Sequence, residues 1–275
     1  MERTKRMPAG CTATGVLKLI ALVFMFIDHS GKMVFGNAVW MRTLGRIAFP
    51  IYGWCLVVGA CHTRSFPKYI LRLLVLYAVS QPLYMVALNH SWNEPNIFLL
   101  LAIAVAGLWG MKEKRYGSQV WAPVLALLLA QVLNCDYGWR GVLFIFLLWA
   151  VRDSRPGIAA VMIAFCLYWG NSSTTLSTLC GLDLTWMKDT FLSSFYSGIF
   201  KMQAMAMLAL PFLLLPDTES LRSVRLPRWA GYAFYPAHLV LLMLMEGVML
   251  SGGFAAVGDR FSGLVLQPVL RLFGM

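Results

Sequence analysis

The chain has 275 residues, of which 59% are hydrophobic and only 13% are charged, and its apolar residues come in long blocks. This composition excludes an ordinary soluble domain and predicts an integral membrane protein. The formal net charge of +11 would suggest nucleic-acid binding in a soluble protein, but the basic residues fall mainly between the apolar blocks. They therefore indicate membrane topology, and we expect no nucleic-acid partner.

The apolar blocks predict the helices. Because about 20 apolar residues cross a bilayer, we expect an all-α, polytopic helical bundle with about nine transmembrane helices, within a range of eight to ten, that forms a single membrane domain over residues 1–275. The predicted helices are Val16–Phe35, Val39–Cys61, Tyr69–Leu88, Asn96–Met111, Val120–Leu133, Val142–Val151, Gly157–Trp169, Gly198–Leu215 and Gly231–Leu250.

The distribution of Lys and Arg between the helices predicts the orientation. Segments on the side of the N-terminus are rich in basic residues, whereas the opposite loops carry few. We therefore expect residues 1–13 to be cytoplasmic and residues 171–197 to form an outer loop. Two interpretations of that loop stay open, an acceptor-binding lid or an ordinary long loop with a short surface helix. In residues 251–275, Asp259 and Arg260 precede an apolar run, Phe261 to Phe273, that is long enough only for an interfacial or incomplete segment, and a tenth span stays open.

Polar residues inside the first two predicted helices are the strongest functional signal. On an ideal helix Lys18, Ala21, Met25 and His29 lie on one face, with Lys18 and His29 about 16 Å apart along the axis. His29 and Arg46 both fall about 10 Å below the outer surface. Ionisable residues at this depth are costly unless they have partners.

Asp28 and His29 are expected to have different partners. Neighbours in sequence are rotated by about 100° on a helix and do not face each other, so Asp28 is better suited to an ion pair with Arg46. Two readings of this group are possible. It is either a structural network that fixes helix packing or a functional site, which three ionisable groups at one depth favour.

Further candidates lie elsewhere in the chain. His62 and Arg64 directly follow the inner end of the second predicted helix, and a functional role and a role as interface anchors are equally possible for them. Asp136 and Tyr137 lie in an outer loop, and Tyr235 and His238 flank a proline that would kink the last predicted helix. The six cysteines show no CxxC spacing and no clustering with histidine, so we expect no metal site.

These residues, taken in order, are similar to the TraX family, which is named for the conjugative F-pilin acetylase. The resemblance covers Val16 to Leu241 and rests on Leu17-Lys-Leu-Ile-Ala with Asp28-His29, Leu44-Gly-Arg-Ile-Ala-Phe-Pro50, His62-Thr-Arg64, Asp136-Tyr-Gly-Trp-Arg-Gly141 and Tyr235-Pro-Ala-His-Leu239. The first helix also resembles wider membrane acyltransferase families, although Lys18 stands where arginine is usual.

The resemblance implies an enzyme of the bacterial inner membrane that moves an acetyl group from acetyl-CoA to the N-terminal amine of a pilin subunit. His29 is then the expected general base, and Arg46 stabilises the oxyanion or holds Asp28. Basic residues expected to attract the donor's phosphates are Lys18, His62, Arg64 and Arg72. Residues expected to bind or support the acceptor are Asp136, Tyr137, Tyr235 and His238.

Two other functions stay open. The first is an O-acyltransferase of the same design that acts on a cell-surface glycan, lipid or peptide. The second is a proton-coupled transporter that uses Asp28, His29 and His238 as a relay, although the chain shows no internal repeat of the kind common in transporters.

Overall fold

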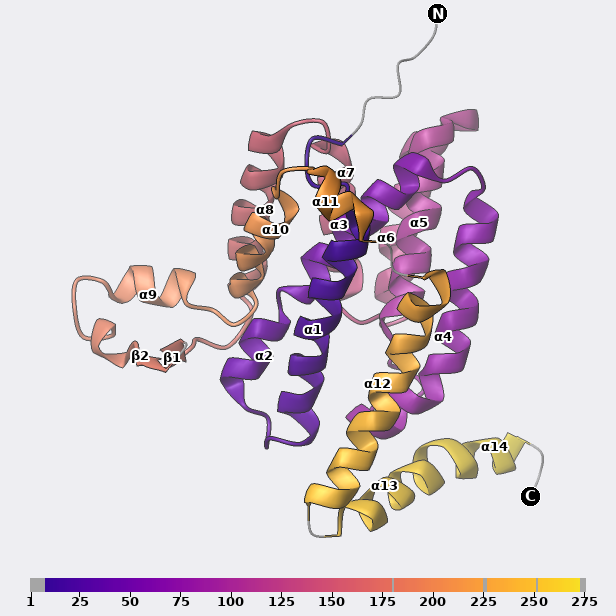
Figure 1. Cartoon of the computed structure of the whole chain (residues 1–275), viewed down its shortest axis with the longest axis vertical. Coiled ribbons are helices and arrows are strands. Elements are labelled where there is room, and N and C mark those ends of the chain that lie inside the picture. The colour runs from indigo at the N-terminus through magenta and orange to yellow at the C-terminus, as the bar shows by residue number, and fades with distance from the viewer. Residues whose placement is uncertain (1–7, 180, 225–226, 251, 273–275) are drawn as a thin grey trace, which may run out of the picture. The chain divides into compact units, whose positions relative to one another are not determined.

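The computed structural model describes residues 8–179, 181–224, 227–250 and 252–272. The described chain is helical apart from one short pair of strands (Figure 1). It divides into two compact units. The first unit holds residues up to Asp28, Ala38–His62 and Phe144–Leu226, and the second holds His29–Asn37, Thr63–Leu143 and the C-terminal part from Pro227.

The first unit is built on α1, α3 and α8. Its elements are α1 (Thr14–Met33, as far as Asp28), α2 (Val39–Gly45), α3 (Ala48–His62), the second half of α7 (Gly138–Ala150), α8 (Arg155–Gly170), β1 (Thr178–Leu179), β2 (Leu182–Asp183), η2 (Thr185–Met187), α9 (Ser193–Ile199), η3 (Ala204–Ala209), α10 (Leu210–Leu213) and α11 (Glu219–Ser223). Its core is aromatic, because Phe49 contacts the rings of Phe144 and Trp169.

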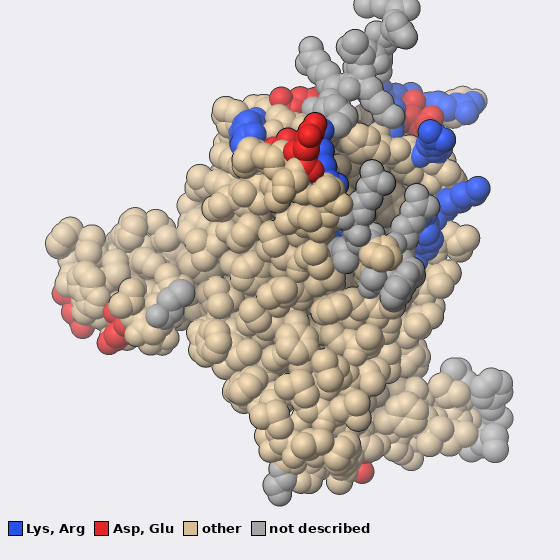
Figure 2. Space-filling view, viewed as in Figure 1, with Lys and Arg blue, Asp and Glu red and all other residues tan. Residues whose placement is uncertain are grey.

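The second unit packs α12 and α5 against α4. Its elements are the end of α1, α4 (Phe66–Leu88), α5 (Ile97–Glu113), η1 (Arg115–Gly117), α6 (Ser118–Val132), the first half of α7, α12 (Arg228–Met249), α13 (Gly253–Phe261), η4 (Ser262–Leu266) and α14 (Gln267–Leu272). In Figure 2 the sides of α4 and α12 show almost no charged atoms, whereas Lys and Arg gather where α4 begins and α5 ends.

The apolar helices agree with a membrane protein, but the predicted number of spans is confirmed only in part. Within the described residues, three helical stretches are long and apolar enough to cross a membrane, namely Thr14–Met33, Val39–His62 and Phe66–Leu88. The predicted span Gly231–Leu250 falls on α12, a helix of 22 residues whose described apolar stretch is Ala233–Met249. The remaining predicted spans fall on shorter helices or on interrupted ones. Residues 253–272 form α13, η4 and α14 in direct succession.

The second predicted helix is interrupted between α2 and α3, where a continuous helix was expected. Pro50 lies in the first turn of α3 and has no backbone N–H. It therefore cannot bond the carbonyl of Arg46, and its ring would crowd that carbonyl in a continuous helix. The chain turns at Arg46 and Ile47 instead.

The prediction of a helix over Gly198–Leu215 was wrong in its first part. Leu176 N donates to the Phe200 carbonyl at 2.8 Å, and Met202 N donates to the Thr174 carbonyl at 3.0 Å. Residues 200–202 thus pair with an extended segment and cannot enter a helix. Helical structure resumes at η3 and continues into α10, which has Pro211 in its first turn.

The segment before α1 is tied to the segment before α11 in the first unit. The Asp217 carboxylate accepts hydrogen bonds from the Thr12 backbone N–H at 2.8 Å and from the Thr12 hydroxyl at 2.5 Å, and it pairs with Arg222 at 3.1 Å. Burial opposes ionisation of Asp217, but the hydrogen bonds from Thr12 and the charge of Arg222 leave its pKa below the ordinary value.

Replacing Asp217 with alanine is expected to lower the thermal stability of the purified protein in detergent. Hydrogen bonds to a charged group contribute about 1.5–3 kcal/mol, which corresponds to several degrees in Tm. Because the folded-state pKa is lowered, this contribution is present above about pH 4, the unfolded value, and is lost as the pH falls through the folded value. Asp189→Ala, at an exposed position, is the control, and equal Tm values for the two variants would contradict the assignment.

Candidate functional site

Asp28 binds two arginines, one with each carboxylate oxygen. Arg42 Nη1 lies 2.8 Å from Asp28 Oδ2, and Arg46 Nη2 lies 2.8 Å from Asp28 Oδ1. The three side chains are only 11–19% exposed. The predicted ion pair between Asp28 and Arg46 is confirmed. Arg42 forms a second ion pair with the same carboxylate, so the cluster of one acid and two bases carries one net positive charge.

The local sequence explains how α2 presents both arginines to one carboxylate. Arg42 and Arg46 are four residues apart, so they fall on the same side of a helical turn, and Arg46 Nε donates to the Arg42 carbonyl at 3.1 Å. Gly45 lies directly against Asp28, since a Cβ atom at this position would be 2.2 Å from the Asp28 Cβ. Only glycine allows α2 to approach α1 this closely.

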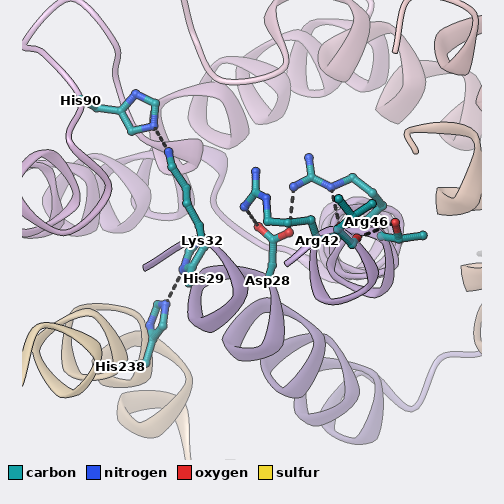
Figure 3. A network of polar contacts seen from close by, with 9 residues as sticks. Asp28, His29, Lys32, Arg42, Arg46, His90 and His238 are labelled. Carbon is teal, nitrogen blue, oxygen red and sulfur yellow. Dashed lines mark hydrogen bonds and ion pairs between the residues drawn. The ribbon is translucent and has the colours of Figure 1, made fainter. Parts of the chain in front are cut away.

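His29 has a different partner, as its position on the helix requires. Its Nδ1 lies 2.8 Å from Nε2 of His238, a residue of α12 that is 209 positions away in sequence. The two rings are nearly parallel, with an interplanar angle of 14°. Figure 3 shows His29 pointing from α1 toward His238, whereas Asp28 points toward Arg42 and Arg46.

The second nitrogen of His238 sets the direction of this hydrogen bond. His238 Nδ1 lies 3.1 Å from the Phe234 carbonyl, which can only accept, so Nδ1 of His238 carries a proton. In the neutral ring, Nε2 of His238 is then an acceptor, and His29 must donate to it from Nδ1. Neutral His29 therefore keeps its basic lone pair on Nε2.

Aromatic side chains enclose the histidine pair in the second unit. The Tyr235 ring lies edge-on to both imidazoles, with centroids 6.4 Å from His29 and 5.2 Å from His238, and it packs against Phe98 of α5 at 4.6 Å. His238 and Tyr235 are both buried. The surroundings thus limit the hydrogen-bond geometries that the His29 ring can adopt.

Lys32 lies one helical turn beyond His29 and contacts a further histidine, His90. Lys32 Nζ lies 3.0 Å from His90 Nε2 (Figure 3). The ammonium can only donate, so His90 accepts at Nε2 and presents Nδ1–H to Glu94, whose Oε1 is 3.3 Å away. Tyr84 stacks on His90 with the ring centroids 4.8 Å apart. A fixed cation therefore lies on the same face of α1 as His29.

The loop between α4 and α5 holds Glu94 in place. Its carboxylate accepts from the Ser91 backbone N–H at 2.9 Å, and this bond, together with His90, lowers the Glu94 pKa. Gln81 then joins the loop to α4, since its side chain donates to the Glu94 carbonyl and accepts from the Asn96 N–H. These hydrogen bonds give the loop a defined conformation, which positions His90.

The other predicted site residues fall in two groups. Asp136, Tyr137 and Tyr235 belong to the second unit, as the histidine pair does, and Tyr235 packs against both imidazoles of that pair. The predicted donor-binding residues are all exposed, and none is bonded to the histidine pair in the contacts described; they are Lys18, His62, Arg64 and Arg72. Their role stays a prediction.

Sequence reasoning missed Arg42, Lys32, His90 and Glu94. Lys32 and Arg42 fall inside the predicted helices Val16–Phe35 and Val39–Cys61 and were not proposed as site residues. The spacing of Arg42 four residues before Arg46, and of Lys32 three residues after His29, was the available signal. Nothing in the local sequence of His90 and Glu94 indicated that His90 contacts α1 or that Glu94 pairs with His90. Among the described residues, no group of three or more His, Cys, Asp or Glu could hold a metal ion.

The fold and these clusters define a helical membrane protein with buried, partnered ionisable groups on its first helix. The chain belongs to the TraX family, because a family model described as "TraX protein" matches residues 13–246.

Named relatives agree with this assignment. A probable fimbrial assembly protein FimC, serogroup H1, of Dichelobacter nodosus is 27% identical over 82% of this chain and 92% of its own length. Protein TraX of Escherichia coli strain K12 is 24% identical over 55% of this chain and 61% of its own length, and a second Escherichia coli protein TraX is 28% identical over 62% and 71%. No solved structure matches the chain.

The charge count of the Asp28 cluster predicts an order of stability among variants. Asp28→Asn leaves two poorly exposed guanidinium groups without a carboxylate, whereas Arg46→Gln leaves one acid with one base. Breaking a buried pair costs about 3–5 kcal/mol, so Asp28→Asn is expected to lower the Tm in detergent more than Arg46→Gln does. Exposed Arg72→Gln is the control, and a larger loss with Arg46→Gln than with Asp28→Asn would refute the charge argument.

Proposed function

We propose that this chain is a multi-pass inner-membrane acetyltransferase that moves the acetyl group of acetyl-CoA to an amine, with the N-terminal amine of a pilin subunit as the preferred acceptor. The observation that carries the proposal is the directed chain from His29 Nδ1 through His238 to the Phe234 carbonyl. It gives His29 a defined basic nitrogen. The family assignment and the fimbrial name of one relative support the choice of acceptor.

In the proposed reaction, His29 Nε2 takes a proton from the acceptor nitrogen. That nitrogen bonds to the acetyl carbonyl carbon, the carbon–sulfur bond breaks, and the proton passes from His29 to the departing thiolate. An N-terminal amine has a free pKa near 8 and is mostly protonated at pH 7, so it releases one proton to water before its neutral form attacks. The proton that His29 takes is the one that the nitrogen loses as the amide forms. A positioned general base typically contributes about 10²–10⁴ in rate.

His238 acts as a positioning residue in this proposal. It keeps His29 in the tautomer with a basic Nε2 and accepts the stronger hydrogen bond that forms when His29 becomes an imidazolium ion. Its own Nδ1–H remains on the Phe234 carbonyl, so it need not change protonation state during the reaction. This role parallels the way in which an acceptor orients a catalytic histidine in other enzymes.

The cations near His29 have distinct proposed roles. Arg46 binds Asp28 through Nη2 and the Arg42 carbonyl through Nε, which supports the role of holding Asp28 and α2 in place. Lys32 lies one turn from His29, held by neutral His90, and is better suited to stabilise the negative charge that develops on the carbonyl oxygen.

The donor is proposed to reach His29 along α1 from the cytoplasmic side. Lys18, His62, Arg64 and Arg72 are exposed and suit the anionic nucleotide of acetyl-CoA by charge. The thioester would then be carried about 16 Å along α1, the rise from Lys18 to His29 on a continuous helix. The proposed orientation, with residues 1–13 cytoplasmic, rests on the distribution of Lys and Arg.

The proposal predicts different effects for three variants of the histidine pair. In purified protein with isotope-labelled acetyl-CoA and a peptide bearing a pilin N-terminus, His29→Gln should reduce acetyl transfer by about 10²–10⁴-fold. His238→Gln keeps an acceptor oxygen and should retain more activity than His238→Leu. The readout is the labelled peptide by mass spectrometry, with exposed Arg271→Gln as the control.

The same assay separates the alternative functions. An acetyl group that hydroxylamine removes would be an ester and would favour O-acylation over the proposed amide. A protein that binds substrate but never consumes acetyl-CoA would support the transporter. An active His29→Gln variant would overturn the assignment of His29 as the base.

A further inference from the structure

A groove in the second unit has no part in the proposed reaction. It runs between α5 and α6 and has a volume of about 730 Å³. This volume is within the range of cavities that hold small ligands. Its walls include Ile103 and Ala106 of α5 and Leu125 and Leu129 of α6. None of the histidine-pair residues lines it.

Small residues create this groove. Gly110 touches α6 so closely that a Cβ atom there would be 2.3 Å from the Ala122 Cβ, and Ser118 donates a hydrogen bond to the Gly110 carbonyl at 2.8 Å. Ala122 and Ala126 are buried at the seam, whereas Leu125 and Leu129 are exposed beside it. The two helices therefore contact each other through small side chains, and larger apolar side chains line the edge of the groove.

One end of the groove is charged and aromatic. Glu113 and Arg115 are the charged residues that line this end, and exposed Lys114 is the sequence neighbour of both. The Trp109 indole donates to Glu113 at 3.4 Å, and the Trp121 indole donates to the Tyr116 carbonyl at 3.1 Å. Tryptophan beside basic residues is typical of the membrane–water interface.

The length of the groove matches one leaflet of a bilayer. Its α5 wall extends from Ile103 to Glu113, which is about 15 Å at 1.5 Å per residue. The hydrocarbon core of a bilayer is about 30 Å thick, so each leaflet contributes about half of this. A chain that begins at the charged end would reach the bilayer centre where the groove ends.

We propose that this groove binds one anionic phospholipid, with an acyl chain lying between α5 and α6 and the phosphate on Arg115. The apolar walls fit an acyl chain, and Arg115 at the mouth, with Lys114 next to it in sequence, fits an anionic headgroup. Arg115 can bind a phosphate through two nitrogens. The inference is independent of the proposed acetyl transfer.

Brominated lipids test the proposal, because bromine on an acyl chain quenches a tryptophan that it contacts. The full-length protein is reconstituted in bilayers with brominated phosphatidylglycerol or brominated phosphatidylcholine at equal fractions. Stronger quenching by phosphatidylglycerol is expected, and Trp121→Phe should remove part of this excess. Arg115→Gln should reduce the preference about fivefold, equivalent to about 1 kcal/mol per basic residue near the surface.

Steric blocking of the groove supplies the second arm. Ala106→Phe fills the groove and should abolish the phosphatidylglycerol preference, whereas Ala78→Phe on α4 and Arg72→Gln, both at exposed positions, should leave it unchanged. Equal quenching by the two lipids would overturn the proposal. An unchanged lipid preference in Ala106→Phe would also overturn the proposal. A disulfide cross-link between two copies that carry Leu128→Cys would overturn it as well, because it would show that a second chain covers this face.

Discussion

The hydrogen bond between His238 Nδ1 and the Phe234 carbonyl determines the chemistry available to His29. A carbonyl cannot donate, so it fixes the proton on one nitrogen of His238 and thereby the direction of the next bond. The basic lone pair of neutral His29 is consequently on Nε2. In a helix bundle of low local dielectric, hydrogen bonds of this kind are strong and hold the rings in one arrangement.

The same physical constraint explains the cluster of Asp28, Arg42 and Arg46. An isolated carboxylate on an apolar helix is very costly, and two guanidinium groups satisfy both of its oxygens. The close contact at Gly45 joins α2 to α1 at this point. Consecutive residues of α1 thus have different partners, since Asp28 joins α2 to α1 and His29, the proposed base, contacts α12.

The sequence predicted those features that depend on local geometry. The rotation of about 100° between neighbouring residues correctly separated the partners of Asp28 and His29, and the ion pair to Arg46 followed from depth alone. The contact of His29 with His238 could not be predicted, because it depends on how α12 packs, 209 residues away. The same limitation hid the contact of Lys32 with His90. The break before Pro50 was predictable in principle, but the continuous apolar run concealed it.

The position of the proton on His29 is the most direct test of this account. Nitrogen NMR of protein with ¹⁵N-labelled histidine, in bilayers near neutral pH and with His29→Gln used to assign the signals, distinguishes a protonated ring nitrogen from a bare one. The account predicts a proton on Nδ1 of both His29 and His238 and a bare Nε2 on His29. A proton on Nε2 of neutral His29 with a bare Nδ1 would contradict it.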